Sequence, residues 1–178
     1  MAKSLGVYLT FILRHKPESI GLEMDTEGWV SIQSLIEKSQ RPITFDRLMH
    51  EVAQDEKGRF QVSTDQIQIR CVQGHSTLCV KREYPTAIPP DVLYHGTSAD
   101  NLDSILSSGL NASHRHHLHL SNSLETAIQV GSRRKQELVV LEIDSGAMHR
   151  EGHTFFISEN NVWLIEFVPQ KYLTVMGK

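Results

Sequence analysis

The stretch FQVSTDQIQIRC, residues 60–71, decides how the first half of the chain folds. Apolar and polar residues alternate on both sides of the turn-forming residues 63–65. A period of two residues places every second side chain on the same face of a strand. The stretch therefore predicts two strands joined as a hairpin, with Phe60 and Val62 in the first strand and Ile67, Ile69 and Cys71 in the second.

Short helices are expected before this hairpin. Ser31 and Thr44 each precede a segment with helical spacing, where a hydroxyl can cap the first turn. An earlier helix, which Pro17 helps to terminate, has an apolar face formed by Leu5, Leu9, Ile12 and Leu13. With a short extended piece before Ser31, the order helix, strand, helix, helix and hairpin is typical of a winged-helix module.

Strand signals dominate the second half of the chain. They are VLYHGT (92–97), HLHLS (117–121), ELVVLEID (137–144) and VWLIEFV (162–168). Two helices are expected between them. One covers residues 98–108 with Gly109 as its C-terminal cap, and the other begins near Asn122 and ends near Arg133 and Arg134. This half is expected to be α+β, with a sheet that splits into two packed layers.

The two halves are joined by KREYPTAIPPD, residues 81–91, whose three prolines are typical of a linker. We expect a first domain at residues 1–84, a linker at 85–91 and a second domain at 92–178. Residues 1–84 carry 11 basic and 11 acidic side chains, and residues 85–178 carry 7 and 10, which accounts for the net charge of −3. A nucleic acid partner would therefore be held by a few placed cations, because a long basic groove is not available.

A membrane or secreted location is not expected. No apolar run approaches the roughly 18 residues of a membrane span, and the N-terminal residues lack a small-residue cleavage site. A cytoplasmic protein is expected, and nothing in the sequence requires more than a monomer. Cys71 and Cys79 lie in apolar, strand-like stretches, so two buried thiols without a redox role are expected.

The stretch HRHHLHLS, residues 114–121, concentrates histidines and one arginine. In a strand, Arg115, His117, His119 and Ser121 would share one face. A His-x-His pair can bind zinc, but Arg115 would repel the cation, no cysteine is near, and Glu125 is the nearest carboxylate in sequence. A strand that merely carries these side chains is the plain alternative. We favour a face that binds an anion or nucleotide, because its side chains are hydrogen-bond donors.

Four other short strings have a similar character: LRHK (13–16), KGRF (57–60), QGHS (73–76) and YHGT (94–97). Each has an ordinary explanation when taken alone. The cations of LRHK can stabilise a helix C-terminus, and KGRF can be a solvated turn. A glycine beside a histidine after a strand allows close backbone approach to a ligand, but this pair is common by chance.

Taken in order, LRH, KGRF, QGHS, LYHGT, SHRHHLHLS and GSRR resemble the RNA 2′-phosphotransferases of the KptA type, from Leu5 through VWLIEFVP. The resemblance implies a winged-helix RNA-binding lobe followed by an NAD-binding lobe with an ADP-ribosyltransferase-like split β-sheet. It also implies an enzyme that removes an internal 2′-phosphate from RNA and uses NAD⁺ as a co-substrate, without a metal. The phosphate first attacks the nicotinamide ribose and expels nicotinamide. The ribose 2″-hydroxyl then attacks phosphorus, which gives 2′-hydroxyl RNA and ADP-ribose 1″,2″-cyclic phosphate.

The resemblance also assigns roles to residues. It implies that Arg14, His15, Arg59 and Arg115 are catalytic, with an acid or base role open to His15 because histidine titrates near neutral pH. It implies that His95, Gly96, Thr97, His119 and Ser121 bind NAD⁺, and that Val162 matches a third strand motif where many proteins of this fold carry a glutamate. The border of the site is expected to contain Gln73, Gly74, His75, Ser76, Arg133 and Arg134.

Two rival functions remain open at this point. A transferase of the same fold could attach ADP-ribose to a terminal phosphate of a nucleic acid and stop after the first step. The same arginines would serve that reaction. A winged-helix regulator with a zinc-binding second domain would instead show stoichiometric metal and no dependence on NAD⁺.

Overall fold

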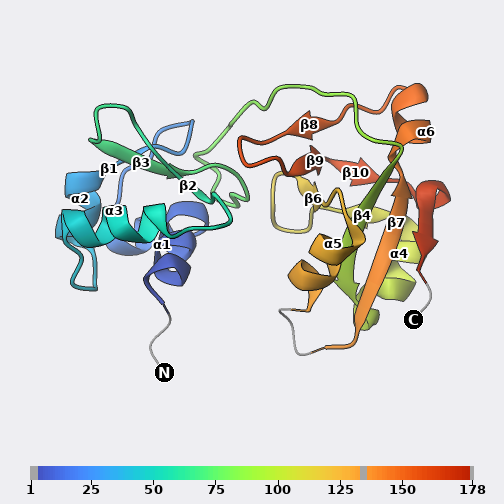
Figure 1. Ribbon diagram of the computed structural model, residues 1–178, viewed down its shortest axis with the longest axis horizontal. Coiled ribbons are helices and arrows are strands. Elements are labelled where there is room, and N and C mark those ends of the chain that lie inside the picture. Colours follow the sequence, from blue (N-terminus) through green and yellow to red (C-terminus); the bar gives the residue numbers. More distant parts are fainter. Residues whose placement is uncertain (1–3, 133–135, 177–178) are drawn as a thin grey trace. The chain divides into compact units, whose positions relative to one another are not determined.

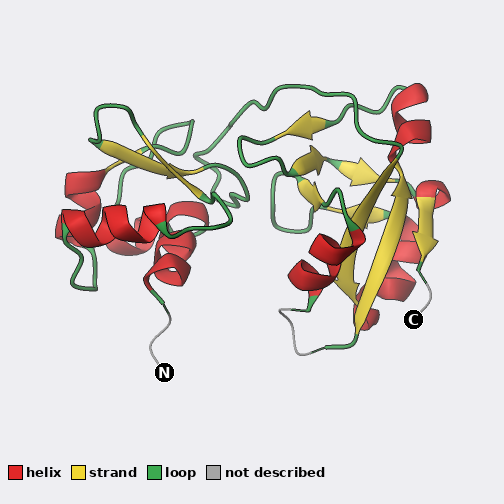
Figure 2. Cartoon of the chain, in the orientation of Figure 1, coloured by secondary structure: helices red, strands yellow, loops and turns green. Residues whose placement is uncertain are grey.

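The computed structural model describes residues 4–132 and 136–176, which form a mixture of helices and strands (Figures 1 and 2). The chain divides into two compact units, Met1–Glu83 and Tyr84–Lys178. Each unit has its own hydrophobic core. No helix in the described ranges is long and apolar enough to cross a membrane.

The first unit contains the helices and the hairpin expected from the sequence. Its elements are α1 (Leu5–Arg14), the 3₁₀ helix η1 (Pro17–Ile20), β1 (Val30–Ser31), α2 (Ile32–Lys38), α3 (Phe45–Ala53), β2 (Phe60–Val62) and β3 (Gln68–Cys71). The hydroxyls of Ser31 and Thr44 accept hydrogen bonds from the first turns of α2 and α3, at 3.3 Å each. These caps confirm the expected helix starts.

The three strands of this unit form an antiparallel sheet in the order β1-β3-β2. Phe60 pairs with Cys71 and Val62 with Ile69, so the hairpin has the alternating register that the sequence predicted. One detail of that prediction is wrong. Ile67 lies before β3 and is exposed, because the turn extends through residue 67.

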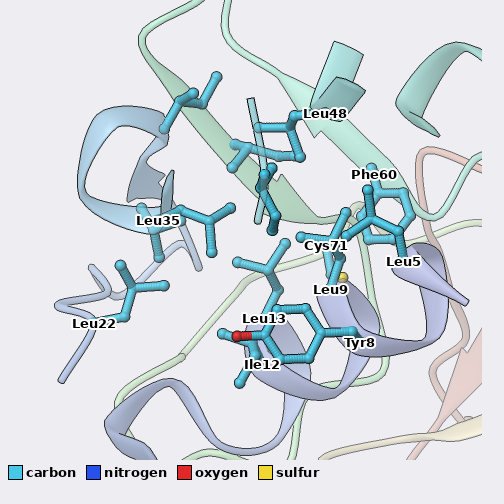
Figure 3. Packing of buried hydrophobic residues seen from close by; sticks show 14 residues of the cluster. Leu5, Tyr8, Leu9, Ile12, Leu13, Leu22, Leu35, Leu48, Phe60 and Cys71 are labelled. Carbon is cyan, nitrogen blue, oxygen red and sulfur yellow. The ribbon is translucent and has the colours of Figure 1, made fainter. Parts of the chain in front are cut away.

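The apolar face of α1 forms the centre of the first core. Leu9, Ile12 and Leu13 are almost completely buried, and they lie with side chains from the other helices and the hairpin (Figure 3). The other labelled members of this cluster are Leu5, Tyr8, Leu22, Leu35, Leu48, Phe60 and Cys71. This packing fixes the end of α1 against β3, where several of the expected site residues are found.

The second unit is richer in strands. It contains β4 (Val92–Ser98), η2 (Ala99–Asn101), α4 (Leu102–Ser108), β5 (Leu110–Asn111), β6 (Leu118–Leu120), α5 (Leu124–Gly131), β7 (Leu138–Asp144), α6 (Ser145–Arg150), β8 (Phe156–Ile157), β9 (Trp163–Ile165), β10 (Phe167–Val168), η3 (Gln170–Tyr172) and β11 (Leu173–Val175). Its sheets have the orders β11-β7-β4, β6-β9-β8 and β10-β5. A bridge between Tyr94 and Ser121 connects β4 to the residue after β6.

Several expectations for this unit need correction. The strand in the histidine stretch covers only residues 118–120, so Arg115 lies in the preceding bend and not on a strand face. Helix α5 is capped by Ser123 in place of Asn122 and ends at Gly131, while Arg133 and Arg134 lie outside the described residues. The sequence did not predict α6, a six-residue helix capped by Asp144.

The proline-rich stretch, residues 81–91, has contacts within each unit. Arg82 is buried within the first unit. In the second unit the Ala87 N–H donates to the Phe155 carbonyl at 3.0 Å, and the Ile157 N–H donates to the Pro85 carbonyl at 3.1 Å. Much of this stretch is therefore held by hydrogen bonds.

Candidate functional site

The end of α1 presents Arg14 and His15. Arg14 is the last helical residue and its side chain is buried. His15 is the C-terminal cap, and its N–H still donates to the Phe11 carbonyl at 3.0 Å. Pro17 follows at the start of η1, where its missing N–H is tolerated. The chain therefore turns away directly after these two side chains.

The loop of residues 73–76, which follows β3, lies against this helix end. The Ser76 N–H donates to the Arg14 carbonyl at 2.9 Å, and Ser76 Oγ lies 2.9 Å from Nδ1 of His15. Gly74 has φ of +87°, and a Cβ atom there would lie 3.2 Å from Nη1 of Arg14. Both the left-handed backbone and the close approach favour glycine at this position.

Arg59, just before β2, is oriented by Asp55. The carboxylate of Asp55 accepts hydrogen bonds from the Arg59 backbone N–H and from Nε, and it forms an ion pair with Nη2 at 2.7 Å. Burial raises the pKa of the Cys71 thiol, while the positive charges of Arg14 and Arg59 oppose that rise.

This group of residues in the first unit, Arg14, His15, Arg59 and residues 73–76, is called the arginine cluster below. Nε and Nη2 of Arg14 and Oε1 of Gln73 are buried and have no hydrogen-bond partner among the residues that the structure describes. A buried donor without a partner is costly, and more so when it is charged. An anion that accepted from Arg14 would remove this cost, so the cluster is chemically suited to bind an anion.

His75 has a different environment from its neighbours in the loop. It is 3% exposed, and its Nε2 would lie 3.0 Å from a Cβ atom placed on Gly28, which has φ of +84°. His75 thus packs against the turn before β1. The geometry indicates that it supports the loop from within the unit.

The second unit contains a pocket of about 600 Å³. This volume lies in the range of about 300–1,000 Å³ that is usual for small-molecule sites. Six residues expected to bind substrate or cofactor line it: His95, Gly96, Thr97, Arg115, His119 and Ser121. Its remaining lining residues are Asn101, Ser104, Ile105, Gly109, Leu110, Asn111, Ala112, Ser113, His114, His117, Leu118, Val130 and Gly131.

Hydrogen bonds connect three of these lining residues. Nδ1 of His95 lies 3.0 Å from the His119 carbonyl, so this nitrogen must carry the proton. Nη1 of Arg115 lies 3.2 Å from Nδ1 of His119. Because a guanidinium only donates, Nδ1 of His119 accepts, and its ring proton is then on Nε2. Arg115 and His119 thus lie side by side, although only His119 belongs to a strand.

Gly96 has a structural reason for being glycine. A Cβ atom at this position would collide with the Ala127 carbonyl and lie 3.1 Å from Cα of Gly131, so α5 requires a glycine here to pack against β4. The sequence reading attributed Gly96 to close approach of a ligand after a strand. The structure places it in the middle of β4, with the helix as its close neighbour.

His117 and Val162 differ from the other candidates. His117 lines the pocket, but its ring also contacts Tyr84 and Phe156 edge-on, with centroids 5.6 Å away in each case. Burial lowers the pKa of His117, partly opposed by Glu166. Val162 is absent from the pocket lining and belongs to a turn in which its N–H donates to Ser158 Oγ at 3.1 Å.

No sequence motif pointed to the lining residues from η2, α4 and β5, among them Asn101, Ser104 and Asn111. Serine and asparagine are common at helix ends and turns, so no pattern marked them. Cys79 was also misjudged. It is exposed, whereas Cys71 is buried as expected. Among the described residues, no group of three or more His, Cys, Asp or Glu side chains could hold a metal ion.

Comparison with known proteins gives consistent results. A family model described as RNA 2′-phosphotransferase, Tpt1 / KptA family, matches residues 2–167. A protein of Burkholderia lata named probable RNA 2′-phosphotransferase is 48% identical over 173 residues, 96% of this chain and 89% of the relative. Proteins with the same name from Fusobacterium nucleatum and Pseudomonas aeruginosa are 44% and 47% identical. The matches cover 95% and 93% of this chain, and 96% and 92% of those relatives.

Proposed function

Because the chain belongs to the Tpt1/KptA family of RNA 2′-phosphotransferases, we propose that it removes an internal 2′-phosphate from RNA in a reaction that consumes NAD⁺. The products are RNA with a 2′-hydroxyl, nicotinamide and ADP-ribose 1″,2″-cyclic phosphate. The two proposed lobes are a winged-helix RNA-binding lobe and an ADP-ribosyltransferase-like lobe. The three helices and the β2–β3 hairpin support the first, and the separate antiparallel sheets support the second.

The observation that carries this proposal is the buried guanidinium of Arg14. Its Nε and Nη2 have no hydrogen-bond partner within the described residues, and the positive charges of Arg14 and Arg59 both act to lower the pKa of the Cys71 thiol against the effect of its burial. A phosphate monoester carries two negative charges and several acceptor oxygens, which suits two arginine side chains. The first unit has balanced charges overall. Such a unit suits an enzyme that binds one phosphate tightly and the rest of the RNA weakly.

The proposed roles rest on the family resemblance. In the first unit, Arg14 and Arg59 bind the 2′-phosphate, and in the second unit Arg115 serves as a catalytic cation that stabilises negative charge in the reaction. The phosphate is already an anionic nucleophile, so its positioning matters more than a general base. His15, whose Nδ1 lies 2.9 Å from Ser76 Oγ, is the proposed group for proton transfer.

NAD⁺ supplies the ADP-ribose group that accepts the phosphate. The pocket of the second unit has a suitable size, and its lining combines donors with the apolar side chains of Ile105, Leu110 and Leu118. We propose that His95, Thr97, His119 and Ser121 hold this co-substrate. The hydrogen bonds of His95 Nδ1 with the His119 carbonyl and of His119 Nδ1 with Arg115 fix the ring orientations of both histidines before a ligand arrives.

The test is a short labelled RNA with one internal 2′-phosphate, incubated with the protein and EDTA, with and without NAD⁺. Loss of the phosphate only with NAD⁺, together with formation of the cyclic ADP-ribose phosphate, is the expected result. Accumulation of ADP-ribosyl RNA would instead indicate an enzyme that caps phosphates. No reaction under any condition would overturn the proposal.

A further inference from the structure

Arg82, in the stretch that looks like a linker, is buried inside the first unit with 8% of its surface exposed. Its Nη1 donates to the backbone carbonyl of Cys71 at 3.4 Å and also to that of Val72. A single nitrogen atom therefore binds two successive carbonyls at the end of β3. These are the last two residues before the loop of residues 73–76.

The other side of the Arg82 guanidinium faces Glu27. Nε of Arg82 lies 3.6 Å from Oε2 of Glu27, and Nη1 of Arg70 lies 3.3 Å from the same oxygen. The turn that carries Glu27 is fixed by hydrogen bonds from Glu27 and Trp29 N–H groups to the Asp25 carboxylate, at 2.9 Å and 2.8 Å. Glu27 thus contacts Nε of Arg82, while Nη1 of Arg82 binds the carbonyls at the end of β3.

Val72 connects this anchor to the arginine cluster. Its carbonyl accepts from Arg82, and its N–H donates to the Arg59 carbonyl at 3.0 Å. The chain then continues through Gln73 and Gly74 to Ser76, which binds the backbone of Arg14 and the ring of His15. The position of Val72 therefore affects both ends of the cluster, through Arg59 on one side and through the loop on the other.

We propose that Arg82 is a positioning residue for phosphate recognition: it fixes the end of β3 so that Arg59, Arg14 and His15 are held in one arrangement. The proposal rests on the proposed function, since it assigns the arginine cluster to the RNA phosphate. Arg82 acts through the two carbonyls and does not itself contact the RNA.

The kinetic test compares Arg82→Lys with Arg82→Met. Both replacements have long unbranched side chains, but only lysine has a nitrogen with several donors, which can bind both carbonyls as Nη1 does. We expect Arg82→Met to raise KM for 2′-phosphorylated RNA about 10-fold or more, with a smaller effect on kcat. Arg82→Lys should stay within about 3-fold of the parent. Equal KM values for the parent and Arg82→Met would overturn the proposal, as would failure of lysine to rescue.

A second readout does not depend on catalysis. Cys71 is buried and shares the end of β3, whereas Cys79 is exposed. In a Cys79→Ser background, the rate at which a disulfide reagent modifies Cys71 reports how often this strand end opens. Arg82→Met should raise that rate about 10-fold, Arg82→Lys should not, and Glu27→Gln should have an intermediate effect. An unchanged rate in Arg82→Met would contradict the anchoring.

The two readouts separate this proposal from the proposed function. The parent protein could lack phosphotransferase activity while Cys71 is modified faster in Arg82→Met. In that case Arg82 would still fix the end of β3, but its role in phosphate recognition would be contradicted. If Arg82→Met lacks a cooperative unfolding transition, Glu27→Gln provides both measurements. A parent-like KM in a folded Glu27→Gln protein with increased Cys71 reactivity would show that the anchor has no effect on recognition.

Discussion

The carboxylate of Asp55 holds Arg59 at three points. It accepts from the Arg59 backbone N–H at 2.5 Å and from Nε at 2.8 Å, and Nη2 lies 2.7 Å from Oδ1. The side chain of Asp55 is only 3% exposed, while that of Arg59 is 28% exposed. The arginine is therefore fixed on its protein side and keeps accessible surface on the other, as expected for a residue that receives a ligand.

Replacing Arg59 should separate activity from stability. Arg59→Ala should lower kcat/KM for 2′-phosphorylated RNA by about 100-fold or more, because a preorganised charged donor is lost. It should also lower the free energy of unfolding by about 1–3 kcal/mol, since the buried Asp55 loses its partner. Steady-state kinetics and urea unfolding measure the two effects.

The matched control is the double variant Arg59→Ala with Asp55→Asn. It removes the buried negative charge that Arg59→Ala leaves without its partner. The double variant should regain part of the lost stability and none of the activity. Circular dichroism showing that Arg59→Ala is unfolded would identify Arg59 as a structural residue.

Replacing Arg14 should change stability in the opposite direction, because its buried Nε and Nη2 lack a hydrogen-bond partner in the described part of the chain. Arg14→Met should raise the urea midpoint, since a buried charge is replaced by an apolar chain of similar length. The same change should reduce turnover about 100-fold. Inorganic phosphate should stabilise the parent and not Arg14→Met, because binding to the native state raises the unfolding free energy. A lower midpoint with parent-like activity would contradict an anion-binding role.

Much of the fold was predictable because its signals are local. Each signal lies within a few residues of the element that it defines. Examples are the hydroxyl caps at Ser31 and Thr44, the helical spacing before Pro17 and the alternation in residues 60–71. The prediction that Cys79 is buried was wrong because its exposure does not depend on local signals. Its neighbours are apolar, but residues 77–80 lie outside the strands, and no local signal determines what covers them.

The candidate site shows the same difference between local motifs, which were predictable, and contacts between residues far apart in sequence, which were not. The strings around Arg14, Arg59 and Arg115 were recognisable, and their order indicated the family. Gly96 lines the pocket as expected, but its packing against Ala127 and Gly131 could not be predicted, because these residues lie more than 30 positions later in the chain. No sequence motif marked Arg82, which lies in the proline-rich stretch, because its partners at Cys71, Val72 and Glu27 become neighbours only in the folded unit.

A pH-dependent contact is predicted in the second unit, where Glu151 binds Lys171 Nζ at 2.6 Å and the Tyr172 hydroxyl at 2.7 Å. These hydrogen bonds lower the pKa of Glu151 and, with Tyr172, raise the pKa of Lys171 to about 12. The contribution of Glu151 is therefore present above its ordinary pKa of 4.5 and is lost as pH falls through the lowered value. That of Lys171 is complete below 10.5 and is lost as pH rises through about 12.

Thermal unfolding between pH 3 and 7 tests the acidic side of this window. The melting temperature of the parent should fall relative to that of Glu151→Gln as Glu151 becomes protonated, and the difference should shrink in high salt. Glu159→Gln, at an exposed residue outside this contact, is the matched control. Parallel pH curves for the parent and Glu151→Gln would show that the contact does not contribute.

The contact between His15 and Ser76 predicts a change in kcat. Ser76 Oγ lies 2.9 Å from Nδ1 of His15 and thereby sets the orientation of the ring. Ser76→Ala removes this contact but keeps the backbone hydrogen bond from residue 76 to the Arg14 carbonyl. We expect kcat to fall about 10-fold, with KM for RNA nearly unchanged, because ring orientation affects proton transfer more than phosphate binding. Ser76→Thr keeps a hydroxyl and should retain most of the activity. A rise in KM with constant kcat would show that His15 serves to bind the phosphate, and equal losses in both variants would show that the serine matters only for packing.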